Sequence, residues 1–167
     1  MKIFVKIILV MAIGLCGVVC QARKAPKGNL IYCSYSQVGT EGLGKEYCEL
    51  IADPGTEPRV HVVLNQGNRF HYPEVDQEFS ATPEDVRNLQ NWLKENKVYK
   101  LDGYNLQEAI TGGKAYRIYM EYDSGDKVEA RWYGIKVKDK ALEAYHYIYT
   151  FFKPWREAIP DKASTSF

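Results

Sequence analysis

The chain has 167 residues, 26% of them charged and 13% aromatic, with a formal net charge of +1 at pH 7. A chain so close to neutral lacks the clustered basic face that nucleic-acid binding requires, so we predict no nucleic-acid partner. The length suits one domain with a hydrophobic core.

The first 22 residues have the pattern of a secretory signal peptide. A short start containing Lys2 and Lys6 precedes an uncharged, apolar run over residues 7–20. This run is shorter than the roughly 20 apolar residues that a membrane-spanning helix needs. We therefore predict a signal peptide over residues 1–22, with cleavage after Cys20 or Ala22.

Two other fates of this leader are a lipid anchor on Cys16 or Cys20 and an uncleaved N-terminal anchor. Lipoprotein signals usually have a small residue before the acylated cysteine, whereas Leu15 and Val19 hold those positions here. Ordinary cleavage is therefore favoured.

Loss of the leader removes two of the 22 basic residues and none of the 21 acidic ones, which leaves a net charge of −1. The sequence predicts an exported protein, periplasmic or secreted, with no stable membrane span after cleavage. We expect residues 23–160 to form a single α+β domain and residues 161–167 to form a flexible tail.

The first two predicted strands, residues 30–36 and 46–52, each carry one of the remaining cysteines, and the glycine-rich segment between them is typical of a hairpin loop. A hairpin centred between residues 40 and 41 would set Cys33 opposite Cys48 and Ile31 opposite Leu50, all on one face.

Two thiols that meet in an exported protein are expected to be oxidised, so we predict a structural Cys33–Cys48 disulfide. Two buried free thiols are the alternative. A redox pair is disfavoured because the spacing is not that of a C-x-x-C motif.

A third strand is predicted over residues 59–64 and a fourth over 70–79, where Pro73 favours an edge or irregular strand. Thr82 and Pro83 mark the start of a helix that ends near Lys97, with apolar residues at helical spacing. Residues 98–101 are expected to be extended and residues 102–105 to form a turn.

Alternating apolar and polar residues predict a hairpin from two strands, 114–122 and 127–133. A second helix is predicted over residues 138–153, where Pro154 stops or kinks it. The order β-β-β-(β)-α-β-β-α predicts an α+β fold: an antiparallel sheet of about five or six strands with two helices packed on one face.

No motif for a nucleotide, a nucleophile or a metalloprotease occurs, so we predict no catalytic residue, no metal and no cofactor. His61, His71 and His146 are the only histidines; His71 lies near Glu74 and Asp76, but the spacing does not favour a metal site. A carboxylate pair for glycoside hydrolysis has no short sequence signature, so a cryptic hydrolase stays open as an alternative.

Four tyrosines fall on the strand faces opposite the more apolar side chains. An uncovered aromatic face suits contact with a protein or a glycan, although tyrosine is also a common strand residue with no such role. We predict a non-enzymatic exported binding domain of the bacterial envelope or surface. The alternative is an inhibitor or immunity-type protein that blocks an envelope enzyme, which a protruding loop over residues 39–45 would favour. The candidate binding residues are Tyr32, Tyr47, Tyr119, Arg131 and Tyr133.

Two segments of the sequence resemble those of a known group. They are residues 98–105 and the hairpin over residues 116–125, which is followed by Trp132-Tyr133-Gly134. Together these motifs resemble small, uncharacterised exported domains of anaerobic bacteria, and the similarity covers about residues 28–158. The resemblance implies an α+β fold and a bacterial envelope setting. It implies no catalytic residues.

Overall fold

The structure is a computed structural model, and it describes residues 23–39, 44–65, 75–109 and 112–159. The elements in these ranges are the strands β1 (Leu30–Gly39), β2 (Lys45–Ile51), β3 (Arg59–Asn65), β4 (Val75–Ser80), β5 (Tyr104–Gln107), β6 (Lys114–Tyr122) and β7 (Lys127–Tyr133), and the helices α2 (Pro83–Glu95), η1 (Val98–Leu101, a 3-10 turn), α3 (Asp139–Phe151) and α4 (Lys153–Glu157).

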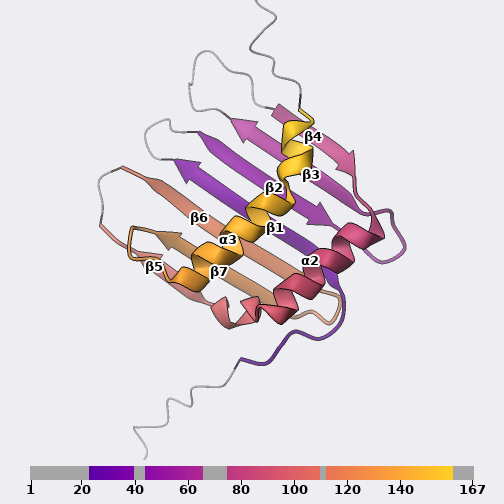
Figure 1. Ribbon diagram of the computed structural model, residues 1–167, viewed down its shortest axis with the longest axis horizontal. Helices are drawn as coiled ribbons and strands as arrows, with labels where there is room; N and C mark the ends of the chain where they lie inside the picture. The colour runs from indigo at the N-terminus through magenta and orange to yellow at the C-terminus, as the bar shows by residue number, and fades with distance from the viewer. Residues whose placement is uncertain (1–22, 40–43, 66–74, 110–111, 160–167) are drawn as a thin grey trace, which may run out of the picture.

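The strands form one seven-stranded sheet in the order β4-β3-β2-β1-β6-β7-β5. Neighbouring strands are antiparallel, except that β5 runs parallel to β7. Figure 1 shows α2 and α3 crossing the same face of the sheet. The predicted α+β class with a mostly antiparallel sheet is confirmed, but the described sheet has more strands than the five or six expected.

The core lies between that face and the helices. Every strand from β1 to β3 and both strands of the β6–β7 hairpin send alternate apolar side chains into it, as a half-buried sheet requires. The largest fully buried side chains include Trp132, Tyr35, Phe152, Leu89, Ile118 and Met120.

Helix α2 begins where the sequence predicts. The hydroxyl of Thr82 accepts a hydrogen bond from the backbone N–H of Asp85 at 3.1 Å, and the Asp85 carboxylate accepts one from the backbone N–H of Thr82 at 2.8 Å. This reciprocal capping box satisfies backbone donors that the first helical turn leaves unpaired. It fixes the entry of α2, whose Leu89 and Leu93 then face the core.

The register of the first hairpin differs from the prediction. Cys33 lies opposite Leu50, and Cys48 lies opposite Tyr35. The centre of the hairpin is one residue further along than expected, so each partner moves by two residues and the buried face is unchanged. The two cysteines share that face as diagonal neighbours, at a separation typically too large for a disulfide.

No Cys33–Cys48 disulfide is present, and both thiols are free and buried. The Cys48 thiol lies 3.3 Å from the hydroxyl of Tyr35. Burial raises the pKa of each cysteine to about 12, so both stay protonated and unreactive at neutral pH. The alternative of two buried free thiols therefore describes this pair.

The turn expected over residues 102–105 is confined to Asp102 and Gly103, and strand β5 begins at Tyr104. Tyr104 pairs with Ala130 of β7 in the parallel register. The crossover is held by Asp102, whose carboxylate accepts a hydrogen bond from the backbone N–H of Glu129 at 3.1 Å, and by Gly103, which has a positive φ of 66°. A short strand beside a glycine turn shows too little alternation to be separated from a turn.

After β4, the described chain contains the helices α2, α3 and α4 besides the 3-10 turn η1. This is one helix more than the two predicted. Helix α3 stops at Phe151, and the short α4 starts at Lys153, around Pro154. Within the described residues, no helix is both long enough and apolar enough to cross a membrane. The predicted leader, the tail over residues 161–167, and the part of the fourth predicted strand before Val75 lie outside the described residues.

Candidate functional site

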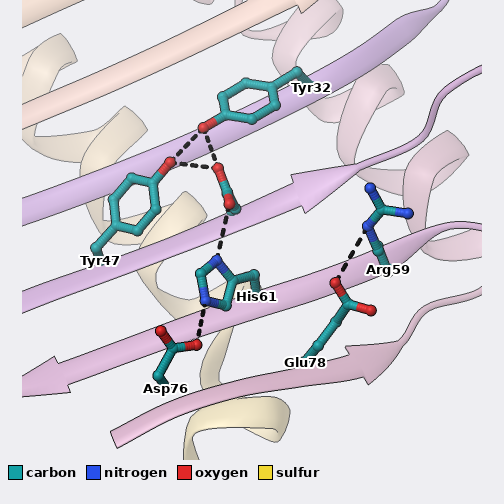
Figure 2. Close-up of polar contacts among 7 residues, drawn as sticks. Tyr32, Tyr47, Arg59, His61, Asp76 and Glu78 are labelled. Atoms are coloured by element: carbon teal, nitrogen blue, oxygen red, sulfur yellow. Dashed lines mark hydrogen bonds and ion pairs between the residues drawn. The ribbon is translucent and has the colours of Figure 1, made fainter. Parts of the chain in front are cut away.

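The sheet face opposite the helices is the candidate site. We call it the open face, because none of the described helices lies over it (Figures 1 and 2). Alternation places one set of polar and aromatic side chains on it from every strand. They include Tyr32, Tyr47, Glu49, His61, Asp76, Arg117, Tyr119, Glu129, Arg131 and Tyr133.

The first cluster on this face is a chain of hydrogen bonds that crosses four strands, from β1 to β4. The hydroxyls of Tyr32 and Tyr47 both lie within hydrogen-bond distance of Oε2 of Glu49 and of each other. Oε1 of Glu49 is 2.9 Å from Nδ1 of His61, and Nε2 of His61 is 2.7 Å from Oδ1 of Asp76. Figure 2 shows this chain projecting from the strands, with the helices behind them.

The electrostatics of this cluster favour a charged histidine. The hydrogen bond with Glu49 raises the pKa of His61, with Asp76 adding to the effect and partial burial opposing it. Burial opposes ionisation of Glu49, but hydrogen bonds from Tyr32, Tyr47 and His61 outweigh it and lower the pKa of that carboxyl. The cluster is therefore a network of ion pairs and hydrogen bonds that fixes the positions of its side chains.

This arrangement does not suit acid–base catalysis. Both ring nitrogens of His61 face carboxylates, so neither is left to take a proton from a substrate. Burial and Glu49 raise the pKa of Tyr32 to about 12, so that hydroxyl stays protonated and acts as a donor. Within the described part of the chain, no group of three or more histidines, cysteines or carboxylates could hold a metal ion.

The second cluster lies on β6 and β7. One carboxylate oxygen, Oε1 of Glu129, accepts from Nε of Arg117 at 2.5 Å and from Nε and Nη2 of Arg131 at 2.8 and 2.6 Å. Beside it, Lys127 lies 2.9 Å from Oε1 of Glu121, which also accepts from the Tyr119 hydroxyl. Glu129 therefore holds one arginine of its own strand and one of the neighbouring strand in place, and Glu121 holds Lys127 of the neighbouring strand.

An aromatic contact joins the two clusters. The rings of Tyr32 on β1 and Tyr119 on β6 meet edge to face, with centroids 5.8 Å apart, and the guanidinium of Arg117 lies 4.8 Å from the centroid of the Tyr119 ring. Polar and aromatic contacts therefore continue across the face from β4 to β7.

A groove of about 350 Å³ opens on this face where β1, β6, β7 and β5 lie side by side. Its floor is low because Ser36 and Ala115 are short, whereas their neighbours in the cross-strand rows, Arg117 and Tyr133, are long. The other side chains of the open face that line it are Val38, Asn105, Gln107 and Arg131.

The five residues predicted as binding residues all lie on the open face. Tyr32, Tyr47 and Tyr119 are half-buried members of the two clusters, and Arg131 and Tyr133 line the groove. The hydroxyl of Tyr133 donates to the carbonyl of Gly112 at 3.1 Å. His146 lies exposed on α3, away from this face, and His71 is outside the described residues.

Sequence reasoning missed the partners of these residues. Glu49, His61, Asp76, Arg117 and Glu129 organise the site, yet none was predicted as a site residue. Their positions in the strand alternation already placed Arg117 and Glu129 beside Tyr119 and Tyr133, which was the available signal. The contacts of His61 depend on the order of β2, β3 and β4 in the sheet, for which no local pattern exists.

No protein-family model matches the chain, and no curated protein has a significantly similar sequence.

Proposed function

We propose that this protein is a non-enzymatic binding domain, exported to the bacterial envelope or surface, that contacts a partner protein through the open face. The observation that supports it is the pair of hydrogen-bonded clusters, which hold tyrosine and arginine side chains in place across the sheet. Tyrosine and arginine are enriched in protein interfaces and among their energetically dominant residues.

Preorganisation strengthens this proposal. Long side chains normally lose rotamer freedom when a partner immobilises them, at about 0.5–1.5 kcal/mol each. Here Tyr32, Tyr47, Arg117 and Arg131 are already held by Glu49 or Glu129. A partner would meet a face that is largely ordered before binding. The export part of the proposal rests on the leader pattern in residues 1–22.

Among the described residues, no observation favours either of the two other functions. A protruding loop over residues 39–45 would favour an inhibitor, but residues 40–43 of it lie outside the described residues. The hydrolase reading needs two carboxylates that converge on a substrate. Glu49 and Asp76 instead bind opposite nitrogens of one histidine.

A site-specific photo-crosslinking experiment tests the proposal. A benzoylphenylalanine residue replaces Lys127 on the open face in one variant and Leu142, which is exposed on α3, in another. Irradiation in the native envelope should link a discrete protein to the Lys127 probe and not to the Leu142 probe.

The Tyr119→Ala/Tyr133→Ala variant should abolish this cross-link, whereas Lys140→Ala/Glu143→Ala on α3 should leave it intact. Equal cross-linking from both probe positions, or an unaffected yield in the tyrosine variant, would contradict the proposal. Saturable binding to a purified polysaccharide without any protein cross-link would replace the protein partner with a glycan.

A further inference from the structure

Among the described residues, the two arginines that line the groove have one acidic partner between them. Arg117 and Arg131 both direct N–H groups at a single oxygen of Glu129. Glu121, the next acid on this side of the face, is bound to Lys127 and Tyr119. Within the part of the chain that the structure describes, two guanidinium groups therefore share one carboxylate, an excess of one positive charge at the groove.

The two guanidinium groups also have unused hydrogen-bonding capacity. An arginine side chain carries five N–H donors in a planar fork. Among the described residues, Arg117 donates one of them and Arg131 two, and all three go to Glu129. The remaining donors of each fork suit a second, planar acceptor, and a carboxylate fits this geometry with two parallel bonds.

Beside the arginines, strand β5 at the edge of the groove offers groups suited to a peptide backbone. Asn105 and Gln107 are exposed on β5, two residues apart, so their amides lie on the same side of the strand. Side chains that alternate in this way repeat every 6.5–7 Å or so, which is also the repeat of an extended peptide. Each side-chain amide both donates and accepts, as the peptide group does.

We propose that this groove binds an acidic segment of the partner protein, with a glutamate or aspartate carboxylate held between Arg117 and Arg131. Asn105 and Gln107 hydrogen-bond the backbone of the segment, and Ser36 and Ala115 leave room for it. This inference deepens the proposed function and rests on it, because it names the chemistry that the open face recognises.

Titration of the full chain with a short peptide tests the inference. The probe is a capped hexapeptide of alternating serine and glutamate, and its glutamine analogue is the matched control. The glutamate peptide should bind and shift the backbone amide signals of β5 and β7, while the glutamine peptide should bind at least tenfold more weakly. Equal binding of the two peptides would overturn the inference.

Variants locate the site. Arg117→Gln/Arg131→Gln should weaken binding of the glutamate peptide at least tenfold. Arg87→Gln/Lys94→Gln, which makes the same charge change on exposed positions of α2, should alter it less than twofold. Ala115→Phe fills the floor of the groove without a change of charge and should also weaken binding. Equal effects of the two charge variants, or normal binding by Ala115→Phe, would contradict the groove.

Small anions separate the possible sources of the carboxylate. Glucuronate or sulfate that competes at concentrations no higher than the peptide would show a free-anion or acidic-sugar site, and it would overturn the peptide assignment. A Lys127 cross-link that persists in Arg117→Gln/Arg131→Gln would refute the groove but leave the proposed function standing. Peptide binding in the groove without any cross-linked partner would refute the proposed function alone.

Discussion

The guanidinium of Arg156 lies 2.9 Å from Oε1 of Glu46, so that α4 is tied to β2 across the covered side of the sheet. The same oxygen accepts from the Tyr35 hydroxyl, and the guanidinium lies 3.6 Å from the centroid of the Tyr149 ring. The side chains of Arg156 and Glu46 are only 11% and 16% exposed. A pair so well shielded is costly to break from one side, because a buried charge is left alone.

We expect Arg156→Met to lower the free energy of unfolding by about 2–4 kcal/mol, since Glu46 would lose its cationic partner. Adding Glu46→Gln to that variant should restore part of the loss. Urea denaturation measures both. Lys153→Met is the matched control, because its pair with Glu157 is exposed and should contribute less than about 1 kcal/mol. Equal losses in Arg156→Met and Lys153→Met would show that the buried pair contributes little.

His61 should make stability depend on pH. Its pKa is raised in the folded state, so its contribution is fully present below the unfolded pKa of about 6.5 and is lost as pH rises through the folded value. We expect the free energy of unfolding of the wild type to exceed that of His61→Gln by about 1 kcal/mol at pH 5.5, and by clearly less at pH 8.5. Chemical denaturation at the two pH values measures the difference. A constant gap would show that His61 contributes by packing alone.

Glu49 acts in the opposite direction. Its pKa is lowered by its hydrogen bonds, so its contribution is present above its unfolded pKa of about 4.3 and is lost as pH falls through the folded value. The stability gap between wild type and Glu49→Gln should therefore shrink on acidification from pH 6 to pH 3. Thermal melts over this range provide the measurement. A gap that widened on acidification would contradict the sign.

The two free thiols should react slowly with alkylating reagents in the folded protein. Cys33 and Cys48 are buried and have raised pKa values, so neither should be alkylated by iodoacetamide in the native protein, whereas both should react after denaturation. Mass spectrometry of the peptides that contain them measures each site separately. A reducing agent should leave the melting temperature unchanged. A linked Cys33–Cys48 peptide in a non-reducing digest would contradict the assignment of two free thiols.

The cap of α2 should contribute measurably to stability. Thr82→Ala removes the hydroxyl that accepts from the Asp85 N–H, and we expect a loss of about 1 kcal/mol. Thr82→Ser keeps the acceptor and should retain most of the stability. Guanidinium denaturation distinguishes the two. If serine and alanine had the same effect, the threonine would act through its methyl group instead.

Local patterns predicted the elements better than their partners. The start of α2 at Pro83 and the β6–β7 hairpin follow from capping and from alternation, and both need only neighbouring residues. The same alternation placed Tyr32 and Tyr119 on the face opposite the core. It does not identify which strands are adjacent, so their ring contact could not be predicted.

The errors have the same origin. A shift of one residue in the hairpin centre keeps Cys33 and Cys48 on the buried face, so hydrophobicity cannot distinguish the two registers. Strand β5 has four residues, and its pairing with β7 depends on a crossover rather than on its own composition. The contact of His61 with Asp76 needs β4 beside β3, which is a property of the whole sheet.

Amide hydrogen exchange in the parallel strand β5 should report whether a ligand occupies the groove. It is the last strand in the described sheet and has only four residues, so its hydrogen bonds to β7 should open more readily than those of the central strands. Asn105 and Gln107 belong to it. A bound segment would hold β5 against β7, and amide hydrogen exchange there would slow with occupancy. The outer wall of the groove would then report, residue by residue, whether the groove is filled.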